Sequence, residues 1–110
     1  DFVMRLEKIV SENLANPSFS NTMLEELLFM GHSTLNRKMK SLFDTTPNDF
    51  IRTRRLAKAA EMLEKGNHRV NEVCYAVGFN SPSYFAKCFK KVYGELPAEW
   101  SKKKGDIADV

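Results

Sequence analysis

Residues 33–43 combine the side-chain types that can recognise the edges of bases. Within a helix, one face of this segment would carry four polar side chains at positions i, i+3, i+4 and i+7: Ser33, Asn36, Arg37 and Lys40. The opposing stripe would be apolar, with Leu35, Met39 and Leu42. Arginine can form a bidentate pair with guanine and asparagine with adenine, so the types fit this chemistry. For Ser33 and Asn36, an ordinary solvated surface is the alternative.

A second segment, "VGFNSPSYFAKCFKKVYG" at residues 77–94, has a related design. Its glycine predicts a turn, and Ser81-Pro82 predicts a helix start with serine at the N-cap and proline at the first position. The inward stripe of this helix would be Phe85, Cys88, Phe89 and Val92. Lysines occupy the remaining faces. The segment therefore predicts a tight turn followed by a helix that is apolar on one side and basic on the other.

The charges of the chain are unevenly distributed, although the formal net charge is only +3 over 110 residues. The charged residues within the range 1–31 are mainly acidic. Cations predominate in residues 33–58 (Arg37, Lys38, Lys40, Arg52, Arg54, Arg55 and Lys58) and in the C-terminal part (Lys87, Lys90, Lys91, Lys102, Lys103 and Lys104). Clustered cations favour an anionic polymer as partner. Solvation of helix surfaces by lysine and arginine is the alternative explanation for the charge alone.

Helix start and stop signals and helical spacing of apolar residues recur along the chain and predict an all-α fold. A first helix-turn-helix is expected at about residues 3–45, a connecting helix at 47–65, a second helix-turn-helix at 70–101 and a frayed tail at 102–110. Ser20 and Asn71 are predicted N-caps, and Thr46-Pro47 opens the connecting helix. We expect the whole chain to form one domain.

The sequence offers no catalytic or metal-binding pattern. It has neither a Gly-rich phosphate loop nor a nucleophile paired with a base, and His32 and His68 are read as polar residues of a loop or helix end. Cys74 and Cys88 lie among apolar neighbours, which predicts buried, reduced thiols and a cytoplasmic protein. No apolar run approaches the roughly 20 residues needed to cross a bilayer. We therefore expect no enzyme, cofactor, metal or membrane contact.

The two halves of the chain resemble each other. "MLEELLFMGHSTLNRKMKSLF" and "VNEVCYAVGFNSPSYFAKCFKKVY" both read as short helix, tight turn and basic amphipathic helix. The second half, as far as "GELPAEW", resembles the signature region of the AraC family of bacterial transcription regulators. "TPNDFIRTRRLAKAAEML" is similar to the connecting helix of that family. The resemblance covers about residues 19–100 and implies sequence-specific binding to double-stranded DNA, with two recognition helices in successive major-groove segments.

The family motif also implies which residues face the groove. In the first motif these are Ser33, Asn36 and Arg37, while Lys38 and Lys40 would meet phosphates. In the second motif the matching positions are Asn80, Ser81, Ser83, Tyr84 and Lys87. Tyr84 could contact DNA or brace the motif, and both possibilities stay open. Phe79, Phe85, Phe89 and Trp100 are assigned to the core. Arg52, Arg54 and Arg55 divide between phosphate contacts and salt bridges, with Arg54 as the structural one.

The first motif departs from the family pattern around its turn. Phe29 stands where glycine or asparagine is common, Gly31 replaces a capping serine and Glu25 replaces a small residue packed between the helices. Asp44 occupies a turn position where glycine is common, and its short polar side chain tolerates a left-handed backbone. We hypothesise that the first motif is less rigid than the second, which predicts weaker amide protection in residues 20–43 than in 70–93.

A helical protein-interaction module without specific DNA binding is the competing function, since the acidic first helix could dock another domain. Such a module could dock a sensory domain or a subunit of RNA polymerase, and we expect a sensory or dimerisation domain outside this fragment. The chain begins at Asp1 without an initiator methionine, which indicates a piece of a longer protein. The sequence of residues 36–56 resembles that of regulators linked to two-component systems.

Overall fold

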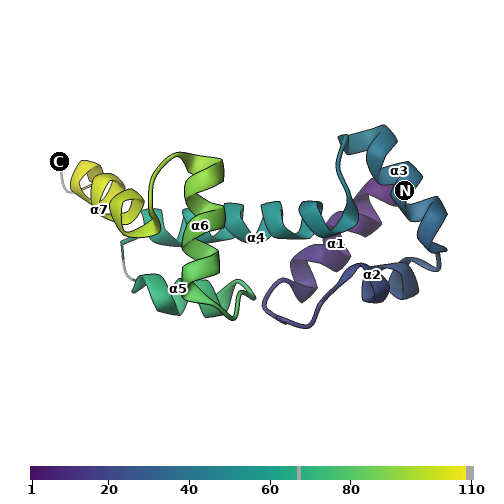
Figure 1. Cartoon of the computed structure of the whole chain (residues 1–110), viewed down its shortest axis with the longest axis horizontal. Coiled ribbons are helices and arrows are strands. Elements are labelled where there is room, and N and C mark those ends of the chain that lie inside the picture. Colours follow the sequence, from purple (N-terminus) through teal and green to yellow (C-terminus); the bar gives the residue numbers. More distant parts are fainter. Residues whose placement is uncertain (67, 109–110) are drawn as a thin grey trace. The chain divides into compact units, whose positions relative to one another are not determined.

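The computed structural model describes residues 1–66 and 68–108, with the side chains of residues 1–66 and 68–102. Helix is the regular secondary structure of these residues, and no strand occurs among them, which confirms the all-α prediction. Figure 1 shows the order of the elements along the chain. They are α1 (Phe2–Asn13), α2 (Asn21–Leu28), α3 (His32–Phe43), α4 (Pro47–Glu64), α5 (Val70–Ala76), α6 (Pro82–Tyr93) and α7 (Pro97–Ala108).

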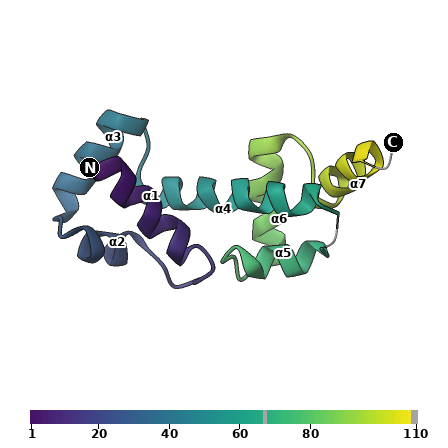
Figure 2. The ribbon, with the colours of Figure 1, turned by 180° about the vertical axis from the view of Figure 1, so that it is seen from behind.

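The chain divides into two compact units, of which the first is Asp1–Arg54 and the second begins at Arg55. Helices α1, α2 and α3 belong to the first unit, and α5, α6 and α7 belong to the second. Helix α4 is continuous from Pro47 to Glu64, so it contributes its first turns to one unit and its remaining turns to the other. Both sides of the helical ribbon can be followed in Figures 1 and 2.

The core of the first unit is built from one apolar face of each of its helices. Its buried residues are Leu6, Val10, Phe19, Leu24, Leu28, Leu35, Met39, Phe50 and Ile51. Removing each such side chain from water contributes about 1.5–3 kcal/mol. The ring centroids of Phe43 and Phe50 lie 5.1 Å apart, which joins the end of α3 to the start of α4. This core fixes one face of α3 and leaves the opposite face in solvent.

The core of the second unit contains a continuous series of aromatic rings. Phe85 lies between Phe79 and Phe89, with centroid distances of 5.1 and 5.8 Å. Phe89 also contacts Tyr93 at 4.7 Å and Trp100 at 5.9 Å. The three phenylalanines predicted for the core are buried, and Trp100 is partly buried against them. Cys74 is buried and Cys88 partly buried in the same cluster, and both are free thiols, as predicted.

Several helix starts follow the predicted capping chemistry. The Asp49 N–H donates to Thr46 Oγ1 at 3.1 Å at the start of α4, and the Tyr84 N–H donates to Ser81 Oγ at 3.3 Å at the start of α6. Ser20 occupies the N-cap of α2 without a side-chain hydrogen bond. The prediction for Asn71 was wrong: Arg69 is the N-cap of α5, and Asn71 already lies within the helix.

Two other predictions need correction. The frayed tail expected at residues 102–110 is wrong for residues 102–108, where α7 continues to Ala108, and residues 109 and 110 lie outside the described residues. Leu42 and Val92 were assigned to the inward stripes of α3 and α6, yet each is 53% exposed. In both helices the inward position of the last turn is taken by an aromatic residue instead, Phe43 in α3 and Tyr93 in α6, each packed against the core of its unit.

The second motif repeats the first with a spacing of 50 residues. Leu35 and Phe85 occupy the fourth position of α3 and α6, and Met39 and Phe89 are buried one turn later. The helices end at Asp44 and Gly94, both left-handed, with φ of 53° and 79°. A short polar side chain therefore does adopt the left-handed conformation expected at Asp44. The repeat places Arg37 and Lys87 at the same position of their helices.

Candidate nucleic-acid interface

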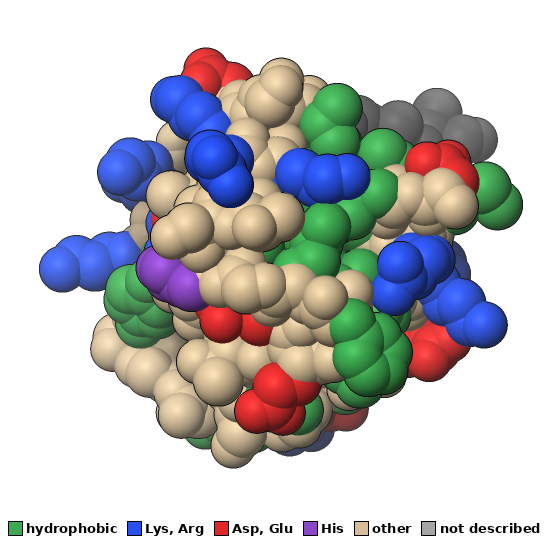
Figure 3. All heavy atoms as spheres, turned by 90° about the vertical axis from the view of Figure 1, so that its right-hand side faces the viewer, with side chains coloured by type: hydrophobic (Ala, Val, Ile, Leu, Met, Phe, Trp, Pro, Cys, Tyr) green, Lys and Arg blue, Asp and Glu red, His purple; other side chains and the backbone are tan. Residues whose placement is uncertain are grey.

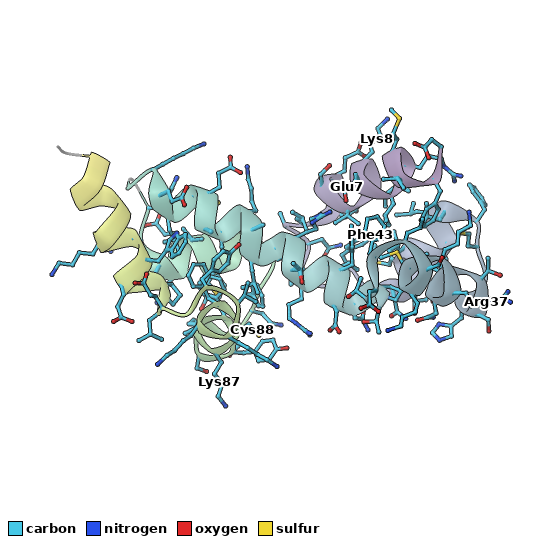
Figure 4. All side chains as sticks on the ribbon, turned by 90° about the horizontal axis from the view of Figure 1, so that it is seen from above. Glu7, Lys8, Arg37, Phe43, Lys87 and Cys88 are labelled. Atoms are coloured by element: carbon cyan, nitrogen blue, oxygen red, sulfur yellow. The ribbon has the colours of Figure 1, made fainter. Side chains whose placement is uncertain are left out.

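The solvent face of α3 is organised around Arg37. This residue lies two positions after buried Leu35 and two before buried Met39, so its side chain leaves the helix on the side away from the core. It is exposed, and it makes no ion pair or hydrogen bond within the described part of the chain. Figure 4 shows its side chain extending outward from the ribbon of α3. Ser33, one turn earlier, is also exposed.

The other two cations of α3 already have partners in their own unit. Lys40 Nζ lies 2.6 Å from Asp44 Oδ1, across one helical turn. The hydrogen bond from Lys40, together with its positive charge, lowers the pKa of the Asp44 carboxyl below its usual value. Lys38 Nζ lies 4.7 Å from the ring centroid of Phe2, which ties it to α1. Arg37 is thus the cation of α3 that can meet an anionic partner without first leaving another contact.

Asn36 takes part in a polar chain that crosses the turn between α2 and α3. Its amide nitrogen Nδ2 lies 2.7 Å from the backbone oxygen of His32 and 3.3 Å from His32 Nε2. The other ring nitrogen, His32 Nδ1, lies 3.0 Å from Glu25 Oε2. The Glu25 side chain is 18% exposed and that of His32 is 67% exposed. Figure 3 shows a histidine with basic side chains on one side of it and acidic side chains on the other.

The start of α6 is held by the side chains that were predicted to face DNA. Ser81 caps the helix and its Oγ lies 3.3 Å from Ser83 Oγ, so Ser81 has a structural role whatever else it contacts. Tyr84 is 48% exposed, and its ring centroid lies 6.1 Å from that of Phe79. The Tyr84 ring therefore contacts Phe79 within the motif, while about half of the surface of the residue remains accessible. Asn80 and Ser83 are exposed on the same part of the helix-turn-helix.

Lys87 is the counterpart of Arg37 in the second motif. It lies between buried Phe85 and Phe89, and it is exposed. Among the residues that the structure describes, it forms neither an ion pair nor a hydrogen bond. In Figure 4 its side chain projects away from α6, while Cys88 follows on the same helix. Lys90 and Lys91 of α6 are likewise exposed and without a contact in the described part of the chain, but Lys87 is the one that stands at the helix position equivalent to that of Arg37.

The three arginines of α4 are committed to contacts within the protein to different degrees. Arg54 donates to Glu7 Oε1 through Nε at 3.2 Å and Nη2 at 2.8 Å, and its guanidinium lies 4.4 Å from the Phe50 ring centroid. This confirms Arg54 as the structural one. Arg52 pairs with Asp49 one turn earlier. Burial lowers the pKa of the Arg55 guanidinium below its ordinary value.

Sequence reasoning missed the roles of Glu25 and His32. Glu25 was read only as a departure from the family pattern, and His32 as a polar residue without a defined partner. The two are seven residues apart and belong to different elements, so no helical spacing relates them. A weaker signal existed for Lys40 and Asp44, whose i,i+4 spacing is that of a helical ion pair.

The described residues were also searched for a metal site and for a membrane-spanning helix. No group of three or more histidine, cysteine, aspartate or glutamate side chains there could hold a metal ion. No helix among those residues is long and apolar enough to span a bilayer.

Two helix-turn-helix motifs, each presenting one basic helix, define a DNA-binding domain of the double helix-turn-helix class. A family model described as helix-turn-helix domain matches residues 24–103. The chain belongs to this family, the AraC-type helix-turn-helix domains, as the motifs predicted. Because the match runs across both motifs, it includes the first motif with its unusual turn.

Known proteins of several kinds contain a similar domain. Histidine kinase P4 of Formosa agariphila is 38% identical over 87% of this chain, which spans 7% of that protein. The chain spans 25% of each of two HTH-type transcriptional regulators that also match. It therefore corresponds to a minor part of the length of these relatives.

Two solved structures share both the fold and detectable sequence identity. The C-terminal domain of the two-component response regulator yesN from Fusobacterium nucleatum is 26% identical, with a TM-score of 0.80, over 87% of this chain and 93% of that one. The DNA-binding domain of AdpA, in complex with a target DNA, is 27% identical with a TM-score of 0.80, over 90% of this chain and 91% of that one.

Proposed function

We propose that α3 and α6 each enter a major groove of one DNA duplex and read its sequence for a transcription regulator. Sequence-specific DNA binding is the function that the family and its DNA-bound member support. The contact residues that we propose are Ser33, Asn36, Arg37 and Lys40 on α3, and Asn80, Ser81, Ser83, Tyr84 and Lys87 in the second motif. The two helices would occupy successive groove segments.

The observation that carries this assignment is the equivalence of Arg37 and Lys87. Most other cations near α3 and along α4 are held by carboxylates or aromatic rings of their own unit. Arg37 and Lys87 are exposed and uncommitted, and each stands opposite the buried stripe of its helix. A guanidinium can pair with guanine O6 and N7, and an ammonium with the same acceptors or with phosphate. These two cations are therefore the best placed to meet DNA.

Lys40 and Ser81 would act in a more limited way. Lys40 would have to exchange its Asp44 contact for a phosphate, and the exposure of this pair makes that exchange inexpensive. Ser81 would keep its capping bond to Tyr84 and offer its hydroxyl hydrogen or second lone pair. Both residues then position the helix on the backbone of the duplex, and specificity falls to Arg37, Asn36 and Lys87.

The rest of the protein is inferred from the relatives. Because the chain spans only a small part of them, we propose that it is the DNA-binding end of a longer cytoplasmic protein, joined to a sensory or dimerisation domain. The histidine kinase and the response regulator among its relatives support a link to two-component signalling. RNA polymerase would be a further partner of such a regulator.

A binding experiment on the 110-residue chain tests the function. Band shifts with mixed-sequence duplexes across a salt series distinguish DNA binding from a protein-interaction module, since only the former gives affinity that falls steeply with salt. Selection from a random duplex library then identifies the preferred site. We expect specific sites to bind at least about a thousandfold more tightly than random DNA at one fixed salt concentration.

Substitutions assign the two cations. Arg37→Ala and Lys87→Ala should each relax selection at particular base positions, by about 1–3 kcal/mol per position. Lys8→Ala on α1 removes the same charge from an exposed residue outside both basic helices and serves as the control. A uniform loss of affinity over all sequences, with the salt slope reduced by about one, would show that the cation contacts only phosphate.

A further inference from the structure

With a neutral imidazole on His32, the Glu25–His32–Asn36 chain has a single consistent arrangement of protons. The His32 backbone oxygen can only accept, so the atom 2.7 Å from it must be the amide nitrogen of Asn36. That nitrogen can only donate, so His32 Nε2, 3.3 Å away, must accept. The imidazole proton then sits on Nδ1, where it is donated to Glu25 Oε2 at 3.0 Å. Glu25 thus selects the tautomer of His32, and His32 selects the orientation of the Asn36 amide.

This arrangement uses both hydrogens of the Asn36 amide. One is donated to the His32 carbonyl and the other to His32 Nε2. The Asn36 oxygen Oδ1 receives no hydrogen bond from any residue that the structure describes. Asn36 therefore faces solvent as an acceptor only. A bidentate pair with adenine needs a donor as well as an acceptor, so the pair expected from the sequence is not available to this side chain.

An acceptor alone distinguishes the bases differently. In the major groove, adenine offers the N6 amino group and cytosine the N4 amino group as donors, whereas guanine offers the acceptors O6 and N7 and thymine the acceptor O4. Asn36 Oδ1 can accept from either amino base and meets unfavourable contacts with the other two. One side chain would thus accept adenine or cytosine at one position of the contacted strand.

We propose that Glu25 and His32 are positioning residues that set the base preference of Asn36 to the two amino bases. This inference rests on the proposed placement of α3 in the groove. It also gives a role to Glu25, which stands where the family has a small residue and is mostly buried beside the turn. Neither Glu25 nor His32 needs to touch DNA to act in this way.

The test compares selected duplexes for the wild-type chain, His32→Ala, Asn36→Ala and the double variant. The wild type should accept adenine and cytosine about equally at one position, each about tenfold over guanine and thymine. His32→Ala frees one amide hydrogen to pair with adenine N7, so adenine should become about five- to tenfold preferred over cytosine there. Asn36→Ala should abolish the preference, and adding His32→Ala should then change nothing.

Two matched variants exclude a purely structural effect. Glu25→Gln retains an acceptor for the Nδ1 proton and should keep the wild-type preference, whereas Glu25→Ala should shift it toward that of His32→Ala. Thr34→Ala, at an exposed position of the same helix, should leave the selected site unchanged. Amide exchange along α3 verifies that each variant is folded.

Different outcomes overturn different claims. A base ratio unchanged by His32→Ala, or a shift that persists in the Asn36→Ala background, overturns the role of the polar chain while leaving DNA recognition intact. A wild-type chain that selects no site at all overturns the proposed function, and the inference with it.

Discussion

The two helix-turn-helix motifs solve the same turn with different residues. In both, a left-handed residue follows the first helix: Phe29, the C-cap of α2, with φ of 56°, and Gly78, one residue after the C-cap of α5, with φ of 96°. The next residue packs inward in each case, partly buried Met30 and buried Phe79, and its N–H donates five residues back along the chain. A glycine adopts this conformation without a steric penalty, whereas a phenylalanine does not. The first turn is therefore the more strained.

The position of the turn explains why one phenylalanine is buried and the other is not. Leu24 and Leu35 are separated by the same number of residues as Cys74 and Phe85, but the left-handed residue comes one position later in the first motif. Phe29 is left 91% exposed, whereas Phe79, its equivalent at a spacing of 50 residues, is 7% exposed. An aromatic residue thus contributes to the core of one motif and only strain to the other.

The starts of the recognition helices differ in the same direction. Ser81 and Pro82 cap and pre-form α6, whereas Gly31 precedes α3 and offers no side chain to its first N–H groups. The surface contacts of His32 with Glu25 and Asn36 are the alternative support for α3. We therefore expect amides in residues 20–43 to exchange faster than those in 70–93. Equal protection of the two segments would contradict the idea that the first motif is less rigid.

The largest expected effect tests the aromatic core of the second motif. Phe89 is fully buried and contacts three other rings, so Phe89→Ala should lower the free energy of unfolding of the second unit by about 3–5 kcal/mol. Amide exchange measured by NMR should show protection lost in α5 and α6.

Phe29→Ala is the matched control, because it removes the same atoms from an exposed site. Its effect should stay within about 0.5 kcal/mol. In Phe89→Ala, amide protection should be lost in α5 and α6 but not in α2 and α3. If that variant lost protection in α2 and α3 to the same extent, the two cores would unfold as one cooperative system, and the comparison of separate motifs would not hold.

The second prediction concerns the backbone strain at Phe29, in the turn of the first motif. Phe29→Gly places glycine at the left-handed position and removes no buried contact, so α2 and α3 should gain about 1 kcal/mol of protection against exchange. The first motif should then approach the second in rigidity.

Asp44→Gly provides the comparison at the other left-handed residue. Asp44 tolerates this conformation better and is paired with Lys40, so its replacement should gain less than that of Phe29. A gain at Asp44 larger than that at Phe29 would show that backbone strain is not what distinguishes the turns.

The third prediction weakens the second motif at its cap. Ser81→Ala should cost about 0.5–1 kcal/mol, the lower part of the range for a cap, because the bond from the Tyr84 N–H is long at 3.3 Å. Thermal unfolding and exchange of the first turn of α6 measure the loss. Ser83→Ala removes an equal hydroxyl that accepts no backbone N–H, so a similar loss there would argue against capping as the cause.

Much of this architecture was predictable because local signals and core periodicity agreed. Thr46-Pro47 and Ser81-Pro82 mark helix starts by their own chemistry, and Phe85 and Phe89 mark a buried face by spacing alone. Leu42 and Val92 satisfied the same periodicity, but which residue of the last turn faces inward depends on the neighbouring elements, and the aromatic residues Phe43 and Tyr93 took that position.

The candidate site was less predictable than the fold. Spacing placed Arg37 on the polar face of its helix, and the family motif placed Lys87 among the groove-facing residues of the second motif. The state of Asn36, in contrast, depends on Glu25 and His32 across a turn. Hydrogen-bond partners of this kind follow from the tertiary arrangement of α2 and α3, since no local pattern relates residues seven apart in different elements. Which atoms Asn36 can offer to a base was thus beyond the sequence.

The smallest expected effect is that of a substitution that gives α3 the N-cap side chain that it lacks. Gly31 has φ of −73° and ψ of 161°, an extended conformation open to any residue, and a Cβ there would meet no atom within 4 Å. Gly31→Ser should therefore stabilise α3 by a few tenths of a kcal/mol, about the known difference between the two residues at an N-cap. Exchange of the first-turn amides of α3 should slow accordingly. Gly31→Ala separates the causes, because it restricts the unfolded chain equally but has no hydroxyl. If alanine stabilised α3 as much as serine, chain entropy and not capping would account for the difference between the starts of α3 and α6.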